Sequence, residues 1–82
     1  MNISVTFVCE GTRINVYCMS TDNIASVINK YRGKAGFEQT NDLCFYFNSK
    51  ELSALGDRQI GSIGINNNAV IDVVKTAQIK GA

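Results

Sequence analysis

The sequence predicts a domain of the α+β class, in which short strands pack against one amphipathic helix. Three patterns indicate this architecture. Apolar residues alternate with polar ones over 3–9 and again over 13–19, as they do in strands with one buried face. Apolar residues then recur at helical spacing over 24–31. An aromatic run over 43–47 alternates again and predicts a further strand.

Composition and charge exclude several classes of protein. A chain with 45% hydrophobic and 18% charged residues is globular, and its net charge of +1 lacks the basic surplus of nucleic-acid-binding domains. No run approaches the roughly 18 apolar residues that a membrane span needs. Because 82 residues are too few for two cores, we expect one domain over 1–75 and a flexible C-terminal tail over 76–82. We also expect a soluble monomer in the cytoplasm and/or the nucleus.

The first half of the chain predicts a hairpin followed by a helix. Strands over 1–9 and 13–19 are separated by the turn 10–12, which is short enough for antiparallel pairing. The polar residues that could cap the helix start are Ser20, Thr21 and Asp22. The apolar residues on the buried helix face are Ile24, Val27, Ile28 and Tyr31. Gly36 is suited to end the helix because glycine accepts a left-handed conformation.

The next strand carries the bulkiest apolar face in the chain. Side chains alternate along a strand, so one face receives Leu43, Phe45 and Phe47 and the other receives Cys44 and Tyr46. The following residues, 48–51, have turn chemistry, and Leu52 then returns to the core.

The last third predicts a loop and a final strand. The segment 53–65 contains three glycines and should form a loop with short turns. Residues 69–75 alternate, with Ile71 and Val73 directed inward and Asp72 and Val74 directed outward.

Cysteines and titratable residues give little support for catalysis. Cys9, Cys18 and Cys44 form no C-x-x-C pair, and an odd number cannot all be disulfide-bonded within one chain. We interpret them as reduced, largely buried thiols; the alternative of a reactive thiol lacks a histidine or basic cluster to activate it. Because histidine is absent and the acids form no motif, we expect no enzymatic activity, no metal site and no cofactor.

The order strand, strand, helix, strand, looped crossover, strand resembles ubiquitin and its relatives across nearly the whole chain. The stretches that carry the resemblance are Asp22-Asn23-Ile24-x-x-Val27-x-x-x-Tyr31, Phe45-Tyr46-Phe47-Asn48-Ser49-Lys50-Glu51-Leu52, and Ile60-x-x-x-x-Ile65 followed by Ile71-Asp72-Val73-Val74. This resemblance implies a ubiquitin-like β-grasp fold, a mixed four- to five-stranded sheet curved around one helix in the order ββαββ. It also implies protein partners, namely conjugation or processing machinery and ubiquitin-like-domain receptors.

Ubiquitin is read by its partners through an apolar patch on the outer sheet face. The resemblance places Tyr46, Asp72 and Val74 at the corresponding positions. The residues expected to border this face are Val8, Tyr17 and Cys44. Ordinary ubiquitin receptors should bind poorly, because desolvating the Asp72 carboxylate without a partner is costly. Tyr46 and Val74 are either interface anchors or a cross-strand pair that only stabilises the sheet, worth roughly 0.2–1 kcal/mol.

The tail departs from the ubiquitin pattern, in which a terminal Gly-Gly is activated and transferred to lysines. This chain has Gly81 and Ala82 instead, and an alanine fits a narrow enzyme channel less well than a glycine. Either Ala82 is trimmed to leave Gly81, or attachment uses different chemistry, or there is none. Some protist ubiquitin-like units are released from precursors without Gly-Gly, and the Asn and Ile content would suit such a source. Lys50 matches a chain-forming lysine of ubiquitin and is a candidate acceptor; the alternative is a solvated turn lysine.

Two functions follow from the resemblance. The first is a ubiquitin-like protein modifier or precursor-derived unit, which is attached through its tail and recognised through its outer sheet face. The alternative is a built-in ubiquitin-like interaction domain of a larger protein, without conjugation.

Overall fold

The computed structural model describes residues 2–37 and 43–75. Its elements are, in order, β1 (Asn2–Cys9), β2 (Thr12–Met19), α1 (Ile24–Ala35), β3 (Leu43–Phe47), β4 (Lys50–Glu51), the 3₁₀ turns η1 (Ser53–Leu55) and η2 (Ile60–Ile63), and β5 (Ala69–Lys75). The predicted helix and the four predicted strands are all present, which confirms the α+β class.

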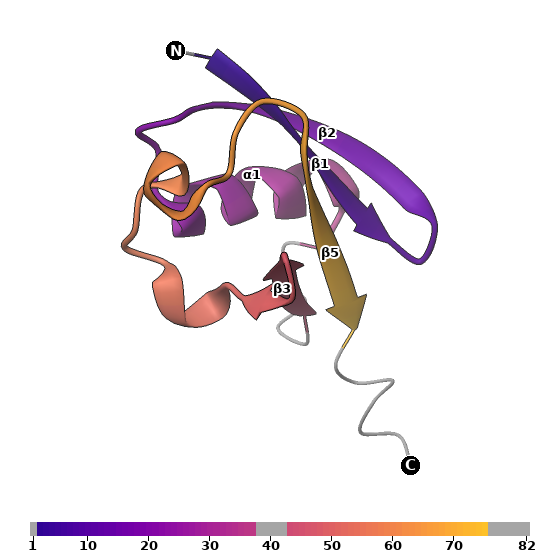
Figure 1. Cartoon of the computed structure of the whole chain (residues 1–82). Helices are drawn as coiled ribbons and strands as arrows, with labels where there is room; N and C mark the ends of the chain where they lie inside the picture. The colour runs from indigo at the N-terminus through magenta and orange to yellow at the C-terminus, as the bar shows by residue number, and fades with distance from the viewer. Residues whose placement is uncertain (1, 38–42, 76–82) are drawn as a thin grey trace.

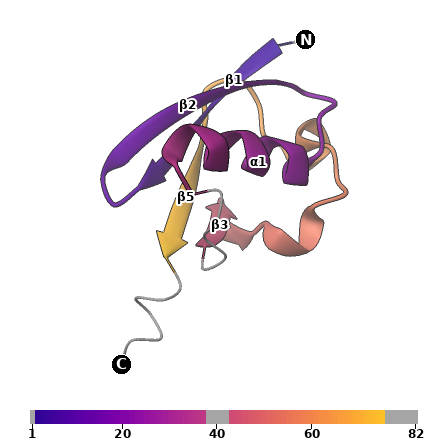
Figure 2. The same cartoon turned by 180° about the vertical axis from the view of Figure 1, so that it is seen from behind.

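The five strands form one mixed sheet in the order β2-β1-β5-β3-β4 (Figure 1). The central strands β1 and β5 are parallel, and every other neighbouring pair is antiparallel. Helix α1 lies across one face of this sheet, as the view from behind also shows (Figure 2). We call the face toward α1 the inner face and the opposite one the outer face. No element of residues 2–37 or 43–75 covers the outer face.

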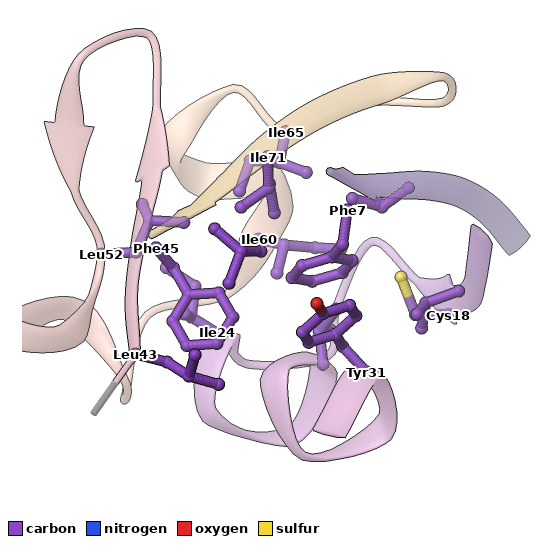
Figure 3. Packing of buried hydrophobic residues seen from close by; sticks show 14 of the residues in the cluster. Phe7, Cys18, Ile24, Tyr31, Leu43, Phe45, Leu52, Ile60, Ile65 and Ile71 are labelled. Carbon is purple, nitrogen blue, oxygen red and sulfur yellow. The ribbon is translucent and has the colours of Figure 1, made fainter. Parts of the chain in front are cut away.

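The core fills the space between the inner face and the helix (Figure 3). Three aromatic rings form its centre: Phe7 stacks on Tyr31 with centroids 4.5 Å apart, and Phe45 meets both rings edge-on at 6.0 and 5.9 Å. Leu52 is fully buried beside them, as the sequence predicted, whereas Phe47 is only half-buried. These inward side chains fix which residues of each strand must face outward.

The start of the helix differs from the prediction. The N-cap is Asn23, whose side-chain oxygen accepts a hydrogen bond from the Ser26 amide at 2.9 Å. The Asp22 carboxylate instead accepts a hydrogen bond from the Met19 amide at 2.9 Å, so it ends strand β2. At the other end, Gly36 has the predicted left-handed conformation, and its amide donates to the Arg32 carbonyl.

Two predicted irregular segments contain regular structure. Only Asn48 and Ser49 form the turn after β3, because the next two residues pair with it as β4. The segment 53–65 includes η1 and η2 and is tied to the helix start. There the Ile24 amide donates to the Arg58 carbonyl, and the Ile60 amide donates to the Asp22 carbonyl. These backbone hydrogen bonds hold the segment 53–65 against the start of α1.

Two glycines should respond in opposite ways to alanine substitution. A Cβ at Gly61 would lie 3.0 Å from the Ser20 carbonyl oxygen, which already accepts a hydrogen bond from the Gly61 amide. We expect Gly61→Ala to lower the free energy of unfolding by about 1–3 kcal/mol. Gly33 lies inside α1, and beyond the helix's own backbone no atom lies within 4 Å of the position that a Cβ would take. Gly33→Ala should therefore raise the free energy of unfolding by about 0.5–1 kcal/mol.

Urea denaturation of both variants beside the wild type measures these differences. Equal destabilisation by the two substitutions would contradict the close contact between Gly61 and Ser20.

Candidate recognition surface

The predicted surface residues project from adjacent strands of the outer face. Val8 of β1, Tyr46 of β3 and Val74 of β5 are half-buried, and Asp72 of β5 is exposed. Strand register places Asp72 between two of them, because it is the Cα partner of Val8 on one side and of Tyr46 on the other. These four residues are therefore cross-strand or near-diagonal neighbours.

The pairing is partly different from the prediction. Tyr46 and Val74 were expected to be neighbours, but the residue directly opposite Tyr46 is Asp72, and the residue directly opposite Val74 is Cys44. Tyr46 and Val74 are diagonal to each other and still border the same depression.

This depression is a shallow hollow of about 600 Å³, which we call the outer hollow. It is lined by Val8, Glu10, Tyr46, Ser49, Asp72, Val73 and Val74. Sequence reasoning missed Glu10 and Ser49, both of which lie in turns with positive φ, 52° and 66° respectively. Glu10 follows Val8 at the spacing of a strand face, and that spacing was the available signal.

Two other predicted border residues lie outside the lining of the outer hollow. Cys44 is half-buried opposite Val74, and Tyr17 is 68% exposed on β2 at the edge of the sheet. Lys50, the candidate acceptor, is exposed on β4 and pairs with Phe47. Gly81 and Ala82 lie outside the described residues, so the attachment site remains a prediction.

The outer hollow carries acidic charge at its centre and rim. None of the hydrogen bonds and ion pairs within residues 2–37 and 43–75 involves the Asp72 carboxylate. The Glu10 carboxylate lies 3.1 Å from Lys75 Nζ, whose ammonium group also lies 5.2 Å from the centre of the Phe37 ring. Of the two carboxylates that line the outer hollow, Glu10 is paired with a lysine of the described residues and Asp72 is not.

Cys9 and Cys18 have the surroundings of structural thiols. Cys9 and Cys18 are buried, and burial raises the pKa of the Cys18 thiol, with a further increase from the Asp22 carboxylate that outweighs the lowering by Lys30. A raised pKa reduces the fraction of reactive thiolate at neutral pH. The described part of the chain contains no group of three metal-ligating side chains.

Two helix lysines occupy the free edge of the sheet at β2. Lys34 Nζ donates to the Asn15 carbonyl at 2.6 Å, and Lys30 Nζ donates to the Tyr17 carbonyl at 3.4 Å. Lysines at an edge discourage pairing with a strand from another chain. Docking on the outer face is therefore favoured over strand addition at this edge.

In residues 2–37 and 43–75, the structure has no helix with the length and hydropathy required to cross a bilayer.

Comparison with solved structures assigns the fold. The ubiquitin of Caldiarchaeum subterraneum superposes with a TM-score of 0.78 and 9% sequence identity, over 92% of this chain and 94% of that one. A structure described as molecular mimicry of SUMO that promotes DNA repair superposes with a TM-score of 0.74 and 12% identity, over 89% and 90% of the two chains. No protein-family model and no curated protein sequence matches the chain.

The class of protein that these superpositions define is the β-grasp domain. Within that class, the chain has the ubiquitin-like fold, which confirms the fold that the sequence resemblance implied.

Proposed function

We propose that this domain is a non-catalytic ubiquitin-like module that is recognised by other proteins through the outer hollow and is attached to targets through its C-terminal tail. The observation that carries the proposal is the uncovered apolar surface of Val8, Tyr46 and Val74 on a ubiquitin-like fold. A half-buried aromatic side chain in a hollow, here Tyr46, is a typical interface anchor because it buries a large area at low entropic cost. Attachment through Gly81 first requires hydrolysis of the Gly81–Ala82 peptide bond, which releases alanine and leaves a free carboxyl group on Gly81 for transfer to a target amine. The protein acts in the cytoplasm or nucleus.

A second candidate is a built-in interaction domain of a longer protein. The sequence feature that favours it is alanine after a single glycine, Gly81-Ala82, where conjugated relatives have Gly-Gly. In this case other proteins still bind at the outer hollow, but the C-terminal tail is not attached to targets.

One experiment with two readouts tests the proposal. The chain is expressed with an N-terminal epitope tag in the cells from which it comes, as wild type, Gly81→Ala and Tyr46→Ala. On a denaturing immunoblot, we expect a ladder of covalent adducts that Gly81→Ala removes. In native capture from the same extracts, we expect Tyr46→Ala to lose most of the proteins bound by the wild type.

The matched control is Gly33→Ala, which makes the same glycine-to-alanine change on an exposed helix position. It should leave both the ladder and the captured proteins unchanged. A single tagged species that Gly81→Ala leaves unaltered would exclude conjugation and support the built-in domain. Unaltered capture by Tyr46→Ala would exclude the outer hollow as the recognition surface.

A further inference from the structure

The outer hollow combines an unpaired carboxylate with apolar walls. Asp72 stands between Val8 and Tyr46 in the strand register, and no hydrogen bond or ion pair among the described residues involves its carboxylate. The lining includes a second acid, Glu10, and no lysine or arginine. The Lys75 ammonium group pairs with Glu10. Among the residues directly across the strands from Asp72, the first basic one is Arg13 on β2, which pairs with Val8 on β1.

A partner that covers this surface must remove water from Asp72. Leaving a carboxylate desolvated and unpaired is costly, so the partner must supply a cation or hydrogen-bond donors at that point. Tyr46 restricts which group of the partner can fill this place. It is the Cα partner of Asp72, and directly opposite strand residues have Cβ atoms about 4.5–5.5 Å apart. A single group can therefore contact both side chains.

A guanidinium group has the required chemistry. It donates two parallel hydrogen bonds to a carboxylate, and its planar face stacks on an aromatic ring. The ammonium group of lysine is a compact, strongly hydrated charge and does not combine these contacts in the same way. An apolar side chain beside the arginine would contact Val8 and Val74, which flank Asp72 on the same face.

We propose that the outer hollow binds an arginine-containing segment of a partner protein, with the guanidinium between Asp72 and Tyr46 and a neighbouring apolar side chain against Val8 and Val74. The inference rests on the proposed function, since it requires the outer hollow to be a recognition surface. It adds the chemical class of the partner.

Selection from a displayed library of randomised linear peptides tests the inference with the full chain. Peptides are selected on the wild type and counter-selected on Tyr46→Ala. We expect the recovered sequences to share an arginine next to a leucine, isoleucine, methionine or aromatic residue. Affinity of a recovered peptide for Asp72→Asn should fall at least about tenfold, and added salt should weaken its binding to the wild type.

Two controls make the measurement specific. Asp57→Asn makes the same neutralisation at an exposed position between η1 and η2, and it should leave the affinity within about twofold, as expected of a surface charge outside the interface. Replacing the arginine of the peptide with lysine should weaken binding to the wild type more than binding to Asp72→Asn, because the variant lacks the carboxylate but keeps the Tyr46 ring.

The outcomes distinguish the inference from the proposed function. Failure to recover any peptide that separates the wild type from Tyr46→Ala would overturn both. Peptides that separate those two proteins but lack basic residues, or that bind Asp72→Asn as tightly as the wild type, would keep the recognition surface and overturn the arginine inference.

Discussion

Phe45→Ala is expected to remove a large fraction of the free energy of unfolding of the domain. The Phe45 side chain is 2% exposed and its ring packs edge-on against both Phe7 and Tyr31 (Figure 3). Truncating a buried phenylalanine typically costs about 3–5 kcal/mol, because apolar contacts are lost and a cavity remains. A chain of this length has a total stability on the order of 4–12 kcal/mol, so this loss is a large fraction of it.

The neighbouring residue provides the control. Tyr46 is adjacent in sequence but lies on the outer face, so Tyr46→Ala should cost only about 1 kcal/mol or less. Urea denaturation followed by circular dichroism measures both losses. A Tyr46→Ala loss as large as that of Phe45→Ala would contradict the assignment of the two faces. It would also mean that binding losses in Tyr46→Ala report unfolding.

The assignment of faces was predictable because it depends on local periodicity. Phe45 and Tyr46 are consecutive residues of a strand and therefore lie on opposite faces of the sheet, and the bulky aromatic core residues could be chosen from this alternation alone. The helix face that contains Tyr31 was predictable for the same reason, since apolar residues three and four apart share one side of a helix.

The helix cap could not be chosen from the sequence. Residues 20–23 are four consecutive polar residues, and each type can cap a helix. The choice depends on one tertiary and one local contact of Asp22. The Ile60 amide donates to the Asp22 carbonyl, and the Asp22 carboxylate accepts from the Met19 amide. With Asp22 held in this way, Asn23 occupies the cap position.

The composition of the outer hollow needed the strand order as well as the periodicity. Periodicity directs Asp72 and Val74 outward, but the neighbours of β5 come from distant parts of the chain, β1 and β3. The two-residue strand β4 is too short to show a period. The turn predicted over 48–51 was therefore longer than the observed turn, which consists of Asn48 and Ser49. The sequence therefore predicted which residues face outward, but it did not predict which of them lie directly opposite each other on neighbouring strands.

Tyr31 should make stability fall at alkaline pH. Its side chain is 1% exposed, and burial raises the pKa of Tyr31 to about 12, with a further contribution from Cys9. In the unfolded chain a tyrosine ionises near pH 10, so the unfolded state loses this proton first as the pH rises. The stabilisation is fully present below about pH 10 and is lost between about pH 10 and 12, a loss of about 2–3 kcal/mol.

Tyr31→Phe isolates this effect because other groups titrate equally in both proteins. At neutral pH the variant loses the interaction of the hydroxyl group with Cys9 and should be up to about 1 kcal/mol less stable. Because phenylalanine cannot ionise, its stability falls less steeply above about pH 10, and the two curves should cross before about pH 12. Denaturant unfolding over this range measures both curves, which should stay parallel between about pH 7 and 9. Curves that remain parallel to the alkaline limit would show that the hydroxyl ionises equally in the folded and unfolded states, and would contradict its burial against Phe7.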